Sequence, residues 1–512
     1  MALLHISDPP FHPSIPLATL TIIAVWAFLR LWRIFFKNPS YPPGPVERNF
    51  LLGNWDDIPT VKPWATYAQW GKVYGDVVHF RLYRQHTIIL NSIEAVDDLL
   101  EKRSNIYSSR SQIEMVNLMG WDFATGIKPY GPQWRNHRRF FQYVFRSAVS
   151  QSLRPVLSKK VNDLLYNLLL TPENFIGHYK SLGAANIMAA VYAYDIAPTN
   201  DYFVSLSENA TARVSLSLAP GPSAVNAFPI LKYLPEWFPG AGFHKLANET
   251  RELTEEMQEL PFRHTKKMMV LDSLSHAYNF RNNQTFQDSG NSPLCIASEL
   301  MERFNSSEED IETIKETAAS LGMFFMAMAT HPEIQKKAQR EIDNVVGNGR
   351  LVTWDDMQLL PYIDALNREL MRWRPALPLG IAHCTTQDDV YKGYFIPKGT
   401  FLFPASNYKL IVFAIPTNGI FHRAISRDER KFKDPDQFNP DRHFDEHGNL
   451  KNDYQSYAFG FGRRICPGRH LALDTLWLAT ASILSAFDIQ PKKDASGNNI
   501  PIDPEYTPGI VW

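Results

Sequence analysis

Hydrophobic residues dominate the N-terminal end of the chain. Residues 15–29 read IPLATLTIIAVWAFL, and the apolar character continues to Phe36 among interspersed basic residues. A run of this length, roughly 20 residues, can cross a bilayer as a helix. Because the positive charges follow the run, they favour a cytosolic location for the rest of the chain. We predict a single-pass membrane anchor over residues 1–37.

Two alternatives to an anchor are open. A cleaved signal peptide would carry its charge before the apolar run and end in small residues, and a buried core helix is the other possibility. The YPPGP stretch at residues 41–45 cannot continue a helix, so residues 38–45 are predicted to form a proline-rich hinge. Since no internal repeat or low-complexity linker follows, residues 46–512 are predicted to form one domain.

The periodicity of this domain predicts a mainly α fold with a small β region. Val78, Phe80 and Leu82 alternate with polar residues in DVVHFRLYRQHTIILNS, which predicts a hairpin. Most other segments show helical spacing of their apolar residues. The predicted helices cover residues 134–145, 306–321, 332–346, 362–373 and about 467–487. The last of these is apolar on most sides, so we expect it at the centre of the domain.

An aromatic stretch broken by prolines, FPILKYLPEWFPGAGF, covers residues 228–243. Ordinary core packing is one interpretation. A surface that dips into the membrane beside the anchor is the other.

The overall charge and cysteine content exclude several classes of protein. The chain has 512 residues, with 52 Lys and Arg against 53 Asp and Glu, so nothing indicates a nucleic-acid partner. Its three cysteines, Cys295, Cys384 and Cys466, are too few and too scattered for a disulfide framework. No CxxC pair supports a structural zinc site.

Cys466 lies in an unusual setting, FGFGRRICPG. Pro467 suits the first position of a helix, which would place the thiol at the positive end of the helix dipole and favour thiolate. Gly462 and Gly468 allow the backbone to approach a flat, bulky group, and Arg464 supplies charge for an anion. These features fit an axial cysteine on the proximal face of a haem. A reactive, zinc-binding or merely buried cysteine is the alternative.

The segment from Phe459 to Gly468 resembles the cysteine-loop signature of the cytochromes P450, the haem-thiolate monooxygenases. Other motifs of that family follow its order along the chain. They are the W-x-x-x-R pair Trp134 and Arg138, the E-x-x-R pair Glu369 and Arg372, the position of His383, and Asp441–Arg442 in FNPDRHF. With the anchor and hinge, the resemblance covers most of the chain. It is nearest to the membrane-bound fungal group that includes the O-methylsterigmatocystin oxidoreductases.

The resemblance implies a cytochrome P450 fold, haem b held by Cys466, and an endoplasmic reticulum location with a cytosolic catalytic domain. Electrons would come from NADPH through a separate reductase, and one atom of O2 would enter a lipophilic small molecule. The cofactor-binding residues would be Cys466, Arg464, Trp134, Arg138, His383, Phe459 and Gly468, of which Cys466 is the metal ligand. Glu369, Arg372 and Arg442 would be structural. A basic cluster on one helix could dock an acidic reductase or form a solvated face: Arg135, Arg138, Arg139 and Arg146.

Three departures from the family pattern stand out. The distal acid–alcohol motif [AG]-G-x-[DE]-T-[TS] is absent, because IKETAAS at residues 314–320 is followed almost at once by Phe324. About a dozen residues, three to four turns at ~3.6 residues each, are missing there. Residues 405–423 form an apolar insertion, and the chain stops at TPGIVW. We interpret these as a skipped exon segment, a retained intron and a truncated end.

These features define the functional hypotheses. The first is a microsomal monooxygenase of secondary metabolism or xenobiotic oxidation. The second is a haem-binding relative with impaired or no oxygenation, because the proton-delivering distal motif is missing. A non-enzymatic membrane adaptor is the third, and a thiolate–haem spectrum would exclude it.

Overall fold

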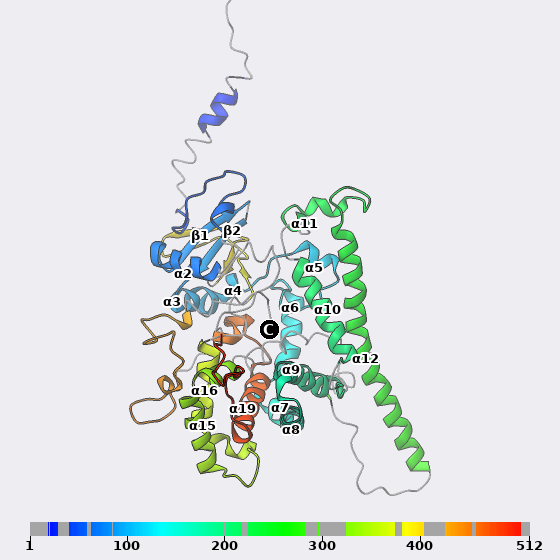
Figure 1. The fold of residues 1–512 in the computed structure, drawn as a ribbon. Helices are drawn as coiled ribbons and strands as arrows, with labels where there is room; N and C mark the ends of the chain where they lie inside the picture. The colour runs from blue at the N-terminus through cyan, green and yellow to red at the C-terminus, as the bar shows by residue number, and fades with distance from the viewer. Residues whose placement is uncertain are drawn as a thin grey trace, which may run out of the picture.

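The computed structural model describes residues 19, 21–28, 40–58, 63–83, 85–197, 200–217, 224–281, 295–296, 324–373, 381–403, 425–452 and 457–502. Helices form most of this part of the chain, and a small sheet region lies at one end, beside α2 (Pro63–Tyr74) (Figure 1). The predicted mainly α fold with a small β region is therefore confirmed. Within the described ranges, no helix combines the length and apolarity needed to cross a membrane.

The sheet region consists of two sheets. The larger has the order β1 (Val77–Leu82), β2 (Gln85–Leu90), β6 (Phe401–Phe403), β3 (His383–Cys384). β1 and β2 are antiparallel, β2 and β6 are parallel, and β3 is antiparallel to β6. The smaller sheet pairs β4 (Asp389–Tyr391) with β5 (Tyr394–Ile396). This topology brings His383 from the second half of the chain beside the N-terminal hairpin.

The hairpin is confirmed, but its polar face is not fully solvated. His79 is buried because the ring of Tyr41 stacks on it with a centroid distance of 4.8 Å. The peptide N–H of His79 also donates to the carbonyl of Pro43 at 2.9 Å. Gly44 packs so closely that a Cβ there would lie 1.7 Å from the carbonyl oxygen of His79. The described part of the predicted hinge is thus docked on β1.

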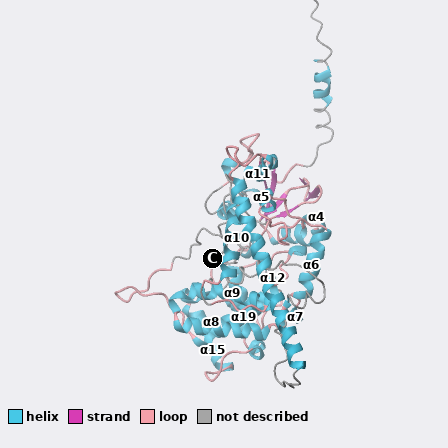
Figure 2. Ribbon diagram, turned by 90° about the vertical axis from the view of Figure 1, so that its right-hand side faces the viewer, coloured by secondary structure: helices cyan, strands magenta, loops and turns pink. Residues whose placement is uncertain are grey.

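The helical body is built around α19. Besides α2, the α-helices in the described ranges are α3 (Ile93–Val96), α4 (Ser104–Tyr107), α5 (Glu114–Leu118), α6 (Pro132–Val144), α7 (Ser147–Ser152), α8 (Arg154–Leu170), α9 (Phe175–Tyr192), α10 (Tyr202–Ser217), α11 (Ala224–Ala227), α12 (Phe243–Arg281), α15 (Pro332–Val345), α16 (Pro361–Trp373) and α19 (Arg469–Ala486). The helix α19 packs against α7, α8, α15 and α16 and is buried on most sides. Its predicted central position is confirmed (Figure 2).

The helices α15 and α16 follow their sequence signals. α15 begins at Pro332. Gly347, just beyond its end, has a φ of 72°, the left-handed backbone conformation that commonly terminates an α-helix. The carboxylate of Glu341 on α15 accepts hydrogen bonds from the backbone N–H groups of Tyr362 (3.0 Å) and Ile363 (3.3 Å). These N–H groups at the start of α16 would otherwise lack partners. One helix therefore caps the next.

The aromatic stretch at residues 228–243 is divided between core and surface, since Ala241 and Phe243 at its end are buried in a hydrophobic cluster, as the core-packing interpretation predicts. It contains a short 3-10 helix, Pro229–Tyr233, and its side chains at Ile230, Tyr233 and Trp237 are 72%, 74% and 80% exposed. The core-packing interpretation is wrong for these three residues. The predicted helix at 306–321, the insertion at 405–423 and the chain end lie outside the described residues.

Candidate functional site

The cysteine loop folds back on itself before α19. The N–H of Cys466 donates to the carbonyl of Phe459 at 2.7 Å, and the N–H of Ile465 donates to the carbonyl of Gly462 at 3.2 Å. Gly460 and Gly462 both have positive φ, 76° and 55°. Residues other than glycine are strained in this region. The glycines therefore permit the reversal that presents Cys466, which is partly exposed.

The prediction that Pro467 begins the last helix is wrong. The helix α19 starts at Arg469, and the buried Gly468 is its N-cap. Pro467 and Gly468 form a turn, since the loop must close on Phe459 before the helix can start. The carbonyl of Cys466 accepts a hydrogen bond from Nη1 of Arg469 at 3.4 Å, so Cys466 still lies beside the first turn of the helix.

Arg464 lies partly buried under the loop and is held by three backbone carbonyls. Its Nε donates to Ser108 O at 2.7 Å, its Nη1 to Thr125 O at 3.1 Å and its Nη2 to Lys128 O at 2.8 Å. Burial, followed by the charges of Arg110 and Arg138, lowers the pKa of Arg464 to about 8. Its surroundings therefore disfavour the charged guanidinium, and an anion beside it would stabilise that charge.

Helix α6 contributes Trp134 and Arg138. Its N-terminal proline and its amphipathic sequence turn Trp134 inward, and the guanidinium carbon of Arg464 lies 4.3 Å from the centre of the indole ring. Nε of Arg138 is buried and has no hydrogen-bond partner among the described residues. Burial lowers the pKa of Arg138, while the charge of Cys466 raises it. Arg138 therefore lies close to the thiolate position.

His383 on β3 completes one side of the site. Its Nδ1 hydrogen-bonds the carbonyl of Tyr107 at 2.7 Å, and because a carbonyl only accepts, Nδ1 carries the proton. Burial and then the positive charge of Arg110 and Arg464 lower the pKa of His383 well below its usual value. The imidazole is therefore neutral in the structure as it stands.

Arg110 belongs to the same cluster and was missed by sequence reasoning. Its Nη1 donates to the carbonyls of Ile381 (2.5 Å) and Ala382 (2.7 Å), and its Nε donates to Gly126 O at 2.9 Å. Its charge lowers the pKa of Arg464 and of His383, so it lies beside both. Arg110 belongs to no periodic pattern or motif in the sequence. Only the structure shows that it follows the buried residues Ser108 and Ser109.

The donor set fits haem propionates. Neither Arg138 nor Arg464 forms an ion pair with a carboxylate in the described ranges, although both are largely shielded from water. Buried charges are costly unless an opposite charge neutralises them. Two carboxylates on the edge of a haem would supply that charge, and Cys466 would supply a thiolate ligand to its iron. The structure thus brings together Cys466, Arg464, Trp134, Arg138, His383, Phe459 and Gly468.

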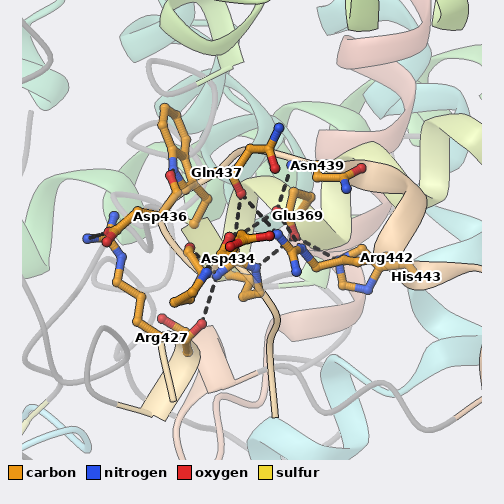
Figure 3. Close-up of polar contacts among 12 residues, drawn as sticks. Glu369, Arg427, Asp434, Asp436, Gln437, Asn439, Arg442 and His443 are labelled. Atoms are coloured by element: carbon orange, nitrogen blue, oxygen red, sulfur yellow. Dashed lines mark hydrogen bonds and ion pairs between the residues drawn. The ribbon is translucent and has the colours of Figure 1, made fainter. Parts of the chain in front are cut away.

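A second polar cluster, shown in Figure 3, supports the region between α16 and the cysteine loop. The carboxylate of Glu369 binds Nη2 and Nε of Arg372 at 2.7 and 2.8 Å, and Nε of Arg442 at 3.0 Å. It also hydrogen-bonds Nε2 of His443 at 3.0 Å and accepts from the N–H of Asn439 at 2.9 Å. His443 and Asn439 were missed, because their neighbours in sequence show no pairing signal.

This cluster ties α16 to the segment before the cysteine loop. Burial raises the pKa of Glu369, but the hydrogen bonds from Arg372 and His443 and the charges of Arg372 and Arg442 bring it down to about 2. Arg372 also donates to the carbonyls of Ser426 (2.8 Å) and Pro435 (2.9 Å). Glu369 is therefore an anion around which residues 426–443 are organised.

A helical domain that carries this cysteine loop beside the guanidinium groups of Arg138 and Arg464, which pair with no carboxylate among the described residues, is typical of a haem-thiolate protein. Residues 42–511 match the family model for Cytochrome P450, and the chain belongs to this family. It is a cytochrome P450 monooxygenase with a haem-thiolate cofactor.

Three fungal relatives show how far the similarity extends. Cytochrome P450 monooxygenase COX2 of Coprinopsis cinerea is 37% identical over 473 residues, which cover 92% of this chain and 86% of the relative. Cytochrome P450 monooxygenase ple1 of Rhodocybe pseudopiperita is 35% identical over 520 residues, with coverages of 98% and 93%. Tryptamine 4-monooxygenase of Psilocybe cyanescens is 33% identical over 481 residues, with coverages of 93% and 91%.

Proposed function

We propose that this monooxygenase inserts one oxygen atom from O2 into a lipophilic small molecule of fungal secondary metabolism. The observation that carries the proposal is the pair of largely shielded cations Arg138 and Arg464 beside the loop of Cys466, neither of which pairs with a carboxylate in the part of the chain that the structure describes. The similarity to fungal monooxygenases supports the metabolic setting. The narrower similarity to O-methylsterigmatocystin oxidoreductases is part of this proposal and rests on the sequence motifs alone.

When bound, the haem would supply the reductive activation of O2 and the transfer of one oxygen atom. The residues of the chain would bind and orient it. Cys466 would hold the iron, and Arg464, Arg138 and Trp134 would hold the propionate edge. Because Nδ1 of His383 already donates to Tyr107, Nε2 can donate to a propionate only when the imidazole gains a proton. A neighbouring carboxylate favours that protonated form.

The function is tested with the purified chain, a fungal NADPH–cytochrome P450 reductase and a panel of lipophilic compounds. We expect a thiolate-type carbon monoxide spectrum and NADPH-dependent oxygenated products. The Cys466→Ser variant should lose both. A wild-type chain that shows the spectrum but oxygenates no compound would favour a haem-binding relative without normal oxygenation, and absence of the spectrum would contradict the site.

The missing distal motif motivates that second candidate. The sequence between residues 314–320 and Phe324 has no glycine–acid–threonine segment, although such residues deliver protons to bound oxygen in the family. Sequencing the transcript across these codons, residues 403–424 and the 3′ end distinguishes the candidates. A restored segment with no insertion indicates ordinary oxygenation. A transcript identical to the chain indicates poor or absent oxygenation.

We propose that the protein is a single-pass endoplasmic reticulum protein whose catalytic domain also touches the membrane. The helix α11 and the β1–β2 hairpin lie at the same end of the molecule (Figures 1 and 2), and large apolar residues in the segments beside them are exposed. The rings of Tyr83 and Phe228 meet there with centroids 5.9 Å apart, so the hairpin and the aromatic stretch adjoin. We call the exposed residues Phe50, Leu51, Ile230, Tyr233 and Trp237 the apolar rim.

We propose that the reductase docks on the exposed arginines of α6 and of the short link between α6 and α7, which contains Arg146. Arg135, Arg139 and Arg146 are exposed, whereas Arg138 is turned towards Cys466 and is not available to a partner. A solvated helix face is the alternative. Charge reversal of the three exposed residues should slow reduction and reduce its dependence on ionic strength if the surface docks an acidic partner. Reduction kinetics unchanged at every salt concentration would indicate a solvated face.

A further inference from the structure

The cysteine loop is supported by a segment that none of the recognised motifs includes. Residues 97–102, DDLLEK, form one widened turn of π-helix, and α4 (Ser104–Tyr107) follows after Arg103. Such turns are rare and frequently lie at functional sites. This turn packs directly against the cysteine loop. We call residues 100–104 the bracket.

The bracket touches the loop at three points. The carboxylate Oε1 of Glu101 accepts a hydrogen bond from the N–H of Gly462 at 2.5 Å. Nε of Arg463 donates to Oγ of Ser104 at 3.2 Å. The carbonyl of Leu100 lies so close that a Cβ on Gly462 would be 2.0 Å from its oxygen. Two backbones in contact and two hydrogen bonds fix the relative position of bracket and loop.

The bracket is itself rigidly placed. Leu99 and Leu100 are fully buried in the same hydrophobic cluster as Phe461 of the loop. Nη1 of Arg103 donates to Oδ2 of Asp389 at 2.7 Å, and the hydroxyl of Tyr107 donates to the same oxygen at 2.8 Å. A small movement of the loop would therefore be opposed by the sheet region as well as by the bracket.

The segment from Glu101 to Ser108 contacts both the cysteine loop and the residues predicted to bind the propionates. Glu101 holds the N–H of Gly462, four residues before Cys466. A few residues later, the carbonyl of Ser108 accepts a hydrogen bond from Nε of Arg464, and the carbonyl of Tyr107 accepts one from Nδ1 of His383. The segment links the thiolate position to the propionate-binding residues through direct hydrogen bonds.

We propose that Glu101 is a positioning residue for the axial thiolate: by binding the N–H of Gly462, it holds the cysteine loop in the conformation that ligates iron. A charged acceptor gives a stronger hydrogen bond than a neutral one. Without an acceptor, Gly462 and the residues up to Cys466 gain freedom, and a larger share of the haem binds without the thiolate. The proposal rests on haem binding at Cys466.

The test uses the full-length holoprotein and three substitutions at one position. Glu101→Ala and Glu101→Met remove the acceptor, and Met keeps the length of the side chain. Glu101→Gln keeps a neutral acceptor oxygen. Glu94→Ala is the matched control, since Glu94 is an exposed carboxylate of the adjacent α3 that pairs with Lys392 at 2.8 Å and does not touch the loop.

The readouts are the fraction of the ferrous carbon monoxide complex that lacks the thiolate-type Soret band, the haem reduction potential and the far-ultraviolet circular dichroism. We expect Glu101→Met and Glu101→Ala to raise that fraction by at least about threefold, with a shifted potential and unchanged helical signal. Glu101→Gln should recover most of the wild-type behaviour, and Glu94→Ala all of it.

Three results would overturn the proposal. The first is a Glu101→Met protein whose spectrum and potential match those of Glu94→Ala. The second is a loss of the thiolate band that follows the loss of helical signal in proportion, which would show a general structural role. The third is a Glu101→Gln protein as impaired as Glu101→Met. If wild-type protein has no thiolate band, the haem site at Cys466 fails instead, and the two failures are distinguishable.

Discussion

Glu369 and Arg372 form a two-point ion pair that water does not reach: their side chains are 0% and 2% exposed, and the shorter contact is 2.7 Å. They lie three residues apart on α16, where such pairs are usually solvated and contribute little. Here the pair is buried because Arg442, His443 and the backbone N–H of Asn439 satisfy the remaining acceptor capacity of the carboxylate. The helix therefore carries a fixed charge into the core.

This buried charge predicts a pH dependence of stability. The pKa of Glu369 is about 2, against an ordinary value of 4.5. Because the folded-state pKa is the lower one, the stabilisation is complete above about pH 4.5 and is lost as the pH falls towards 2. The difference corresponds to about 3 kcal/mol. Urea unfolding of the wild type should show about 2 kcal/mol of this loss between pH 6 and pH 3, and Glu369→Gln should not show it.

The same variant has a matched control on the same helix. Asp364 pairs with Arg368 at 2.9 Å, but its carboxylate is 43% exposed. At neutral pH, Glu369→Gln should reduce the free energy of unfolding by about 3–5 kcal/mol, since it leaves a buried arginine without its charge partner. Asp364→Asn should cost less than about 0.5 kcal/mol. Equal costs would contradict a specific role for the buried pair.

Arg138 predicts a conflict between stability and cofactor binding. Its buried Nε lacks a hydrogen-bond partner among the described residues, so it destabilises the fold until an anion arrives. Arg138→Leu should stabilise the haem-free chain by about 1–3 kcal/mol, the cost of a buried polar group without a partner. It should also weaken haem retention by about tenfold, because a charge-assisted hydrogen bond is lost. Chemical unfolding of haem-free protein and haem transfer to apomyoglobin measure the two effects.

The neighbouring Arg139 supplies the control for this experiment. It lies on the same helix, is exposed, and should tolerate leucine with less than about 0.5 kcal/mol of change and no change in haem retention. The interpretation of Arg138 is wrong if Arg138→Leu destabilises the haem-free chain while its haem retention equals that of Arg139→Leu.

The apolar rim predicts membrane binding that does not need the anchor. With residues 1–39 deleted, the domain should still bind vesicles of neutral phospholipid. Replacing Ile230, Tyr233 and Trp237 with serine should weaken binding by at least about tenfold, since each removes large apolar area from the interface. Flotation with vesicles measures the bound fraction.

A similar set of exposed side chains provides the control. Tyr166, Leu169 and Leu170 on α8 are 62%, 68% and 59% exposed, but α8 lies at the end of the molecule opposite α11 (Figure 1). Serine at these three positions should leave vesicle binding unchanged. If both triple variants lose binding equally, general hydrophobicity explains the result and the rim has no special role.

Sequence patterns predicted the features that depend on neighbouring residues. The cysteine loop, the pair Glu369 and Arg372, and the stripes of α15 and α16 all lie within one segment each, and local spacing identifies them. Arg110 and Glu101 were missed, since each acts on residues far along the chain and its own neighbours show no pattern. The alternation around His79 predicted the hairpin but not the burial of its polar side, because the ring of Tyr41, far back along the chain, stacks on His79.

The contact between bracket and loop gives a final prediction, which compares two glycines of the same loop. Gly460 and Gly462 both have positive φ, so alanine at either position would introduce a similar backbone strain of about 1 kcal/mol. Their surroundings differ. A Cβ on Gly460 would have its nearest neighbour at 3.6 Å, whereas a Cβ on Gly462 would lie 2.0 Å from the carbonyl oxygen of Leu100.

Gly462→Ala must therefore move the loop away from the bracket, while Gly460→Ala need not. We expect Gly460→Ala to lower the melting temperature of the holoprotein slightly and to keep the thiolate-type carbon monoxide spectrum. Gly462→Ala should lose most of that spectrum, because displacement of Gly462 also breaks its hydrogen bond to Glu101. Equal spectra in the two variants would show that strain alone, and not contact with residues 100–104, governs ligation by Cys466.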